Sequence, residues 1–208
     1  MEYKIIKLVV GQLQENCFIL FDENKDAFVV DPGGSSENII EAIEKNSLNI
    51  KYILLTHGHF DHVGAVAALV KKYKAPVYLS KEDRAFLESP KEVRASAFGM
   101  QIEAAEVDVF VKEGDEISFS EGNIIVIETP GHTLGSVCYL FENYLFAGDT
   151  LFNGSIGRTD FPESDHSLMV ESLKKLKKLD DEIYVLSGHG PESQISYEKM
   201  ANPYLRQL

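Results

Sequence analysis

Short runs of apolar residues, separated by polar ones, predict a meander of three β-strands at the start of the chain. The runs cover 3–10, 16–21 and 27–31. A turn at 32–35 follows, and the spacing of isoleucines then predicts a helix over 37–45. Either Ser35 or Ser36 is a candidate N-cap for this helix, because serine hydroxyls accept hydrogen bonds from the first free amides of a helix.

A second apolar run, at 50–56, predicts a buried strand that ends at a polar loop rich in histidine. Beyond this loop the pattern becomes helical, and we expect a helix to about Tyr73 and a short strand over 76–80. Residues 81–98 are helical in pattern, with an interruption near Pro90.

The second half of the chain has the same organisation, with paired strands first and helices outside them. The predicted strands are 116–120, 123–128, 137–141, 144–147 and 182–186. We expect an amphipathic helix over about 164–179 and a last short helix before the end. A sandwich of two sheets covered by helices is the natural packing of such elements.

Composition and charge exclude several classes of protein. The 208 residues are 44% hydrophobic and 25% charged, which is ordinary for one large globular domain or two small ones. The net charge of −13 argues against nucleic acid or an anionic membrane as partner, since both attract basic surfaces. The sequence has neither an apolar run long enough to span a membrane nor a signal-peptide pattern, so we expect a cytoplasmic location.

The two cysteines, Cys17 and Cys138, each lie within an apolar run that is typical of a strand. We expect buried, reduced thiols that pack as small apolar residues. A disulfide or a zinc-binding role is the alternative, although the sequence contains no CxxC motif.

Candidate metal ligands are concentrated where apolar runs end. His57, His59, Asp61 and His62 follow the strand at 50–56, and the pair at positions i and i+2 places two rings on one side of an extended segment. His132, Asp149 and His189 follow later strands, in loops that contain glycine. Imidazole and carboxylate groups bind zinc, iron or manganese. Seven such side chains exceed the needs of one tetrahedral ion, so the count favours two ions.

Three other polar positions have alternative interpretations. Asp31, before the turn, is expected to bond within that turn or else to support a metal ligand from behind. His166 is expected to be a solvated or capping residue at a helix start. Arg158 and Asp160 are expected to form a structural ion pair, with binding of an anionic substrate by Arg158 as the alternative.

Four motifs, in order, resemble those of the metallo-β-lactamase superfamily. They are THGHFDH at 56–62, PGHT at 130–133, GDT at 148–150 and SGHG at 187–190. The resemblance extends over nearly the whole chain and implies an α+β fold, the αββα sandwich, in which two mixed β-sheets are flanked by helices. It also implies a single domain over 1–208, without a separate C-terminal glutathione-binding domain.

The same resemblance implies a role for each ligand. One metal ion would be held by His57, His59 and His132, the second by Asp61, His62 and His189, and Asp149 would bridge them. We expect two divalent ions, zinc foremost, with iron or manganese as alternatives. Asp61 would be the catalytic residue, orienting a metal-bridging hydroxide and accepting its proton. An aspartate at position 149 disfavours the zinc β-lactamases that use a cysteine at the second site.

Within the superfamily, GRTDF at 157–161 and NPYLR at 202–206 resemble the glyoxalase II branch, particularly its short forms. This resemblance implies a binuclear metallo-hydrolase that cleaves a thioester, S-lactoylglutathione or a related hydroxyacyl thioester. No counterpart is evident of the basic helical segment with which full-length glyoxalase II grips glutathione, so the thiol carrier stays open.

Two other hypotheses belong to different classes. A persulfide dioxygenase would use one iron held by His57, His132 and Asp149. A non-enzymatic metal-binding module would have a closed ligand shell. For the favoured hydrolase we expect a small-molecule thioester as partner, neither nucleic acid nor membrane, and a monomer or small homo-oligomer.

Overall fold

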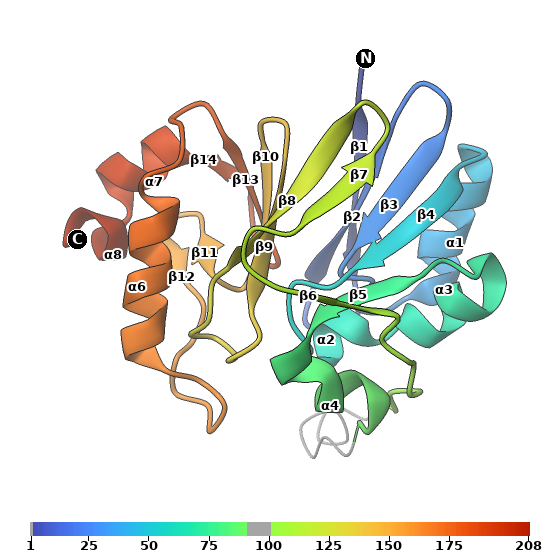
Figure 1. Ribbon diagram of the computed structural model, residues 1–208, viewed down its shortest axis with the longest axis horizontal. Helices are drawn as coiled ribbons and strands as arrows, with labels where there is room; N and C mark the ends of the chain where they lie inside the picture. The colour runs from blue at the N-terminus through green and yellow to red at the C-terminus, as the bar shows by residue number, and fades with distance from the viewer. Residues whose placement is uncertain (1, 91–100) are drawn as a thin grey trace. The chain divides into compact units, whose positions relative to one another are not determined.

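The computed structural model of the protein describes residues 2–90 and 101–208 (Figure 1). The chain divides into two compact units, Met1–Phe110 and Val111–Leu208. The helix predicted over 81–98 is found in part, as the 3-10 turn η1 (Lys81–Asp83) and α4 (Arg84–Glu88); the rest of that prediction falls on residues outside the described ranges.

The sheet of the first unit is mixed. Strands β1, β2 and β3 are antiparallel neighbours, whereas β3, β4 and β5 are parallel neighbours. The sheet order is β1-β2-β3-β4-β5-β6, with the bounds β1 Lys4–Val10, β2 Glu15–Phe21, β3 Asp26–Val30, β4 Asn49–Leu54, β5 Val77–Ser80 and β6 Val109–Val111.

Helices α1 (Ser36–Lys45) and α3 (Val66–Tyr73) cover one face of this sheet (Figure 1). Alternate residues of β2, such as Cys17 and Ile19, form a core with Ile39 of α1 and Leu69 of α3. All seven residues of β2 are buried, which explains why residues 17–21 are a continuous apolar run rather than an alternating one.

The start of α1 differs in one detail from the sequence prediction. Ser35 is the N-cap residue, but its side chain accepts no hydrogen bond from the helix. Its backbone is left-handed, with φ 49°, and its hydroxyl instead accepts a hydrogen bond from the Gly11 amide at 3.3 Å. The serine therefore ties the β1–β2 turn to the helix start.

The sheet of the second unit is also mixed. Strands β7 to β10 form an antiparallel meander, and β13 joins β10 in parallel. The sheet order is β14-β13-β10-β9-β8-β7, with the bounds β7 Glu116–Phe119, β8 Gly122–Glu128, β9 Val137–Phe141, β10 Tyr144–Gly148, β13 Tyr184–Ser187 and β14 Ser193–Gln194.

Helix α6 (His166–Leu176) packs Met169 and Leu173 against Leu145 and Val185 of this sheet. Asp165 caps the helix by accepting hydrogen bonds from the amides of Ser167 and Leu168, and these bonds lower the pKa of its carboxyl group. The predicted last helix is two short ones, α7 (Ile195–Ala201) and α8 (Pro203–Arg206).

The two mixed sheets with flanking helices confirm the predicted α+β class. Four short strands were not predicted: β6, β14 and the hairpin formed by β11 (Leu151–Phe152) and β12 (Ser155–Ile156). Each has only two or three residues, too few to produce a recognisable hydrophobic period. In the described ranges, no helix is both long and apolar enough to cross a membrane.

Both cysteines are buried and free, as predicted. Burial, with the negative charges of Glu15 and Asp31, raises the pKa of the Cys17 thiol well above its ordinary value. We predict that a disulfide-exchange reagent at pH 8 modifies neither thiol in the native protein and both after denaturation, because the reactive thiolate is scarce and inaccessible. Rapid modification of the native protein, followed by absorbance, would contradict this burial.

Candidate metal centre

Parallel strands bring the first ligands of the first unit to one edge of its sheet. Strands β3 and β4 are parallel neighbours, so the residues that follow them leave the sheet side by side. Asp31 directly follows β3, and Thr56 and His57 follow β4. The amide of Asp31 donates to the carbonyl of Leu54 at 3.1 Å, which links these two strand ends.

Asp31 is buried and accepts three hydrogen bonds. Its Oδ1 accepts from the Thr56 amide at 2.7 Å, and its Oδ2 accepts from the Thr56 hydroxyl at 2.6 Å. Its Oδ2 also lies 3.0 Å from Nδ1 of His62. Of the two sequence interpretations, the contacts therefore favour support of a ligand, because the carboxylate holds the His62 ring from behind.

These contacts determine which nitrogen of each neutral ring carries the proton. A carboxylate only accepts, so Nδ1 of His62 donates to Asp31 and leaves a lone pair on Nε2. The Thr56 hydroxyl donates its own proton to Asp31, so its oxygen accepts from Nδ1 of His57 at 3.1 Å. The lone pair of His57 is therefore also on Nε2, the form in which imidazole binds a metal.

The four predicted ligands of this unit lie together. The ring centroid of His57 is 4.8 Å from that of His59 and 4.1 Å from that of His62. Helix α2 (Phe60–Val63) carries Asp61, whose Oδ2 is 3.9 Å from Nε2 of His62. The Asp61 side chain is 13% exposed, whereas that of His62 is completely buried.

Close packing fixes the turn between the first two histidines. The amide of Gly58 donates to Oδ2 of Asp83 at 2.8 Å. A Cβ on Gly58 would lie 2.7 Å from Cβ of Phe86, so no larger residue fits without movement. Phe86 also packs edge-on against His59, at 5.8 Å between centroids. Asp83 and Phe86 were not identified from the sequence, because nothing in their local pattern marks them.

Strand direction gathers the ligands of the second unit in the same way. Strands β8 and β10 run in the same direction, and β10 and β13 are parallel neighbours, so His132, Asp149 and His189 leave the sheet at one edge. Oδ2 of Asp149 lies 3.4 Å from Nε2 of His132 and 3.8 Å from Nε2 of His189. One carboxylate oxygen therefore faces both imidazoles.

The loop after the β11–β12 hairpin supports His132. Nδ1 of His132 lies 2.8 Å from the carbonyl oxygen of Arg158, which only accepts, so the neutral ring carries its proton on Nδ1 and its lone pair on Nε2. Gly157 fits where no side chain could, since its Cβ would lie 1.8 Å from the carbonyl oxygen of Asp149. Sequence reasoning missed this support, because the group that provides it is a backbone carbonyl.

The chemistry of these donor sets fits a divalent metal ion. In the first unit, ligand atoms of Asp31, His57 and His62 lie within 4.8 Å of one another. Three histidines, when neutral, carry their lone pair on Nε2, and a carboxylate oxygen lies near imidazole nitrogens in both units. Imidazole with carboxylate suits zinc, iron and manganese.

The remaining predicted positions have structural contacts. Nε and Nη2 of Arg158 donate to the two carboxylate oxygens of Asp160 at 2.8 and 2.9 Å, which confirms the expected ion pair. The hydrogen bond from Arg158 lowers the pKa of Asp160. His166 is exposed and begins α6, while Asp165 is the cap residue.

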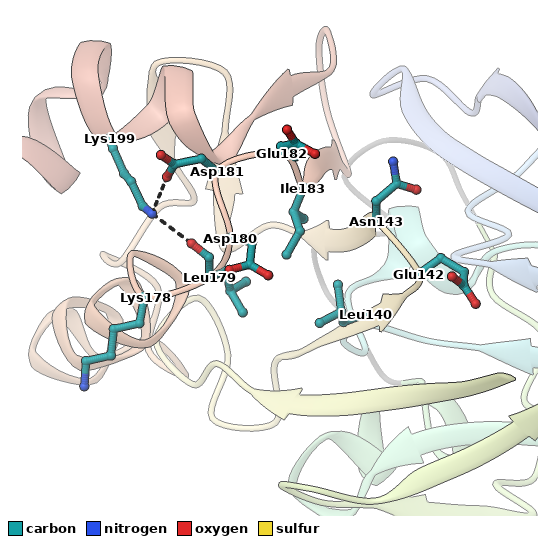
Figure 2. Close-up of a pocket in the computed structure, with 10 residues that line it drawn as sticks. All are labelled: Leu140, Glu142, Asn143, Lys178, Leu179, Asp180, Asp181, Glu182, Ile183 and Lys199. Atoms are coloured by element: carbon teal, nitrogen blue, oxygen red, sulfur yellow. Dashed lines mark hydrogen bonds and ion pairs between the residues drawn. The ribbon is translucent and has the colours of Figure 1, made fainter.

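A pocket of about 740 Å³ lies at the other end of the second sheet (Figure 2). Its walls come from the β9–β10 turn, which precedes β10, and from the connection between α6 and β13. Asp149 and His189 follow the opposite ends of these two strands. Nζ of Lys199 donates to Oδ1 of Asp181 and to the carbonyl of Leu179, so the pocket is braced by structural contacts. It contains none of the predicted ligands.

Comparison with known proteins agrees with these observations. The family model of the metallo-beta-lactamase superfamily matches residues 10–189. The hydroxyacylglutathione hydrolase GloC of Haemophilus influenzae is 39% identical over 201 residues, which cover 94% of this chain and 95% of that protein.

Two crystal structures are similar over nearly their whole length. The BLEG-1 B3 metallo-beta-lactamase has a TM-score of 0.92 and 38% identity, covering 97% of this chain and 99% of that one. TTHA1623 in a di-iron-bound form has a TM-score of 0.86 and 35% identity, covering 96% and 100%.

Two mixed sheets with histidine and aspartate clusters at their strand ends define a metallo-hydrolase of the α+β class. The chain belongs to the metallo-beta-lactamase superfamily and has its fold.

The contacts of Asp31 generate a prediction. Asp31→Asn places an amide donor either against both Nδ1–H of His62 and the Thr56 hydroxyl, or against the Thr56 backbone amide, so the supports of the rings are disturbed. We expect metal affinity, measured by competition with a chelator, to weaken about 10- to 100-fold. Asp22→Asn is the control, because Asp22 is equally buried but its Oδ1 accepts from the Asp26 amide in the β2–β3 turn. Equal metal affinity in both variants would contradict the role of Asp31.

Proposed function

We propose that this protein is a binuclear metallo-hydrolase that cleaves a thioester. The observation that carries the proposal is the position of Asp149, whose Oδ2 faces Nε2 of both His132 and His189. An oxygen placed between two imidazoles suits a carboxylate that bridges two metal ions.

Ligand number supports two ions. The first unit contributes His57, His59, Asp61 and His62, and the second contributes His132, Asp149 and His189. We propose that His57, His59 and His132 hold one ion, that Asp61, His62 and His189 hold the other, and that Asp149 bridges them. Zinc is the first candidate metal, and the di-iron form of TTHA1623 supports iron as an alternative.

The bound metals would supply two things, a lowered pKa for water and an electrophile for the substrate carbonyl. The protein's own side chains would orient the attacking water and exchange its proton. Asp61 is half-buried while the other three ligands of the first unit are buried, so it can reach both metal and solvent. We propose that it orients the attacking water and accepts its proton. A thiolate leaves readily, so the leaving group requires little help from a general acid.

A thioester is the favoured substrate class for two reasons. The relative from Haemophilus influenzae is named a hydroxyacylglutathione hydrolase and aligns over nearly the whole chain. The GRTDF loop, which resembles the glyoxalase II branch, is also the loop whose carbonyl orients His132. We therefore propose S-lactoylglutathione or a related hydroxyacyl thioester, acted on as a free small molecule in the cytoplasm by a monomer or small homo-oligomer.

A second candidate function is hydrolysis of a β-lactam. It is favoured by the 38% identity to the BLEG-1 B3 metallo-beta-lactamase. Asp149 disfavours only those β-lactamases that use a cysteine at the second site, so the thioester is preferred on the GRTDF and NPYLR motifs and on the hydroxyacylglutathione hydrolase relative. Persulfide oxidation by one iron on His57, His132 and Asp149 is the remaining rival.

Substrate assays distinguish these functions. We predict that the metal-loaded protein releases thiol from S-lactoylglutathione, followed with a thiol reagent, at least 100-fold more efficiently, in kcat/KM, than it opens a chromogenic cephalosporin. Oxygen uptake with glutathione persulfide should stay at the background rate. A higher efficiency on the cephalosporin, or persulfide-dependent oxygen uptake, would overturn the proposal in favour of the matching rival.

Asp149→Ala tests the shared ligand. Removing the carboxylate should lower metal content from two ions per chain to one or none and reduce kcat at least 1,000-fold, because catalysis needs both ions in position. Asp180→Ala, an exposed aspartate of the same unit, is the control and should retain both. Metal content is measured by elemental analysis of the purified variants. Full activity in Asp149→Ala would contradict the assignment of Asp149 as the shared metal ligand.

A further inference from the structure

The C-terminal motif NPYLR at 202–206 resembles one branch of the family, but none of its residues is among the predicted ligands. Asn202 is completely buried, as is Glu198 one turn earlier on α7. Their side chains contact each other, with Nδ2 of Asn202 donating to Oε2 of Glu198 at 2.8 Å. Burial of a carboxylate or an amide destabilises the fold unless the group is hydrogen-bonded, so the partners of these two side chains show what they support.

Both side chains hold the β11–β12 hairpin. The amide of Gly154, at the hairpin turn, donates to Oε2 of Glu198 at 3.0 Å. Nδ2 of Asn202 also donates to the carbonyl of Ser155 at 3.0 Å. Oδ1 of Asn202 accepts from the amide of Tyr204 at 2.9 Å, so the same residue caps α8. We name Glu198 and Asn202 the hairpin clamp.

The clamped hairpin and the two residues that follow it contact each ligand of the second unit. It lies between Asp149, two residues before β11, and Gly157, which directly follows β12. Gly157 packs against the Asp149 carbonyl, and the next residue, Arg158, offers the carbonyl that accepts from Nδ1 of His132. Phe152 of β11 packs edge-on against His189, at 6.1 Å between centroids.

We infer that the hairpin clamp is a positioning device for the metal ligands His132, Asp149 and His189. Glu198 and Asn202 touch neither substrate nor metal; they act by fixing the hairpin. Because Arg158 O must point at Nδ1 of His132, a shift of the hairpin releases that ring and moves the Asp149 backbone with it. This inference rests on the proposed function, since it presumes that these three residues bind metal.

Two variants loosen the clamp by different means. Glu198→Gln keeps the size of the side chain but turns an amide donor toward either the Gly154 amide or the Asn202 amide. Asn202→Ser removes the donor to Ser155 and Glu198 but keeps an oxygen that can cap α8, because serine is a good N-cap residue. If one variant fails to fold, the other still tests the inference.

Lys199→Met is the matched control. Lys199 neighbours Glu198 on α7, and its Nζ donates to Asp181 and to the carbonyl of Leu179, away from the hairpin (Figure 2). Its removal loosens the same helix without touching the clamp. Thermal unfolding of the three variants shows whether their losses of stability are comparable.

The decisive readout is metal affinity and the spectrum of the cobalt-substituted protein, measured on folded protein. We expect Glu198→Gln and Asn202→Ser to bind cobalt at least tenfold more weakly than wild type, because removing the groups that support metal ligands typically lowers metal affinity by about this factor. Their visible absorption bands should also change, and kcat for the thioester should fall more than KM rises. Lys199→Met should keep the wild-type affinity and spectrum.

Wild-type affinity and spectrum in both clamp variants would overturn the inference and leave the clamp a purely structural contact. Changes of the same size in Lys199→Met would overturn it as well, because they would report a general loosening of α7. If the wild-type protein binds metal but cleaves no thioester, the proposed function fails while the clamp is still tested by the cobalt spectrum.

Discussion

The site depends on the hydrogen bonds that three histidines donate from Nδ1–H to fixed acceptors. The Thr56 hydroxyl holds His57, the Asp31 carboxylate holds His62, and the Arg158 carbonyl holds His132. Each acceptor keeps the ring proton on Nδ1 and so leaves the lone pair on Nε2. A neutral imidazole binds a metal only through the nitrogen that carries this lone pair. The acceptors are themselves fixed by strand ends or by a packed loop, so the sheets determine the chemistry of the rings.

Strand direction explains why residues so distant in sequence share an edge. Parallel pairing of β3 with β4 brings Asp31 to Thr56, and parallel pairing of β10 with β13 brings Asp149 to His189. In the first unit the ligands follow the parallel strand β4, whereas in the second unit His132 follows β8 of the antiparallel meander, which runs in the same direction as β10. The GRTDF and NPYLR motifs fit this picture as supports: one orients His132, and the other fixes the hairpin beside it.

The sequence was sufficient to predict the main strands and the α+β class. The residues that cluster within each unit could also be identified, because every candidate ligand follows an apolar run. It was insufficient where a structural feature leaves no recognisable pattern in the sequence. Strands β11, β12 and β14 are too short for a period, and Arg158 acts through a carbonyl that any residue possesses. Asp83 reaches Gly58 only through the fold, and Ser35 bonds to Gly11 rather than to its own helix.

The proposed function depends on two metal ions that share Asp149. Anomalous diffraction from crystals of the metal-loaded protein, collected at the absorption edge of the bound metal, tests it most directly. If two metal ions share Asp149, the map contains two peaks per chain, both within bonding distance of the Asp149 carboxylate. A single peak, or two peaks with Asp149 bound to only one of them, would contradict it.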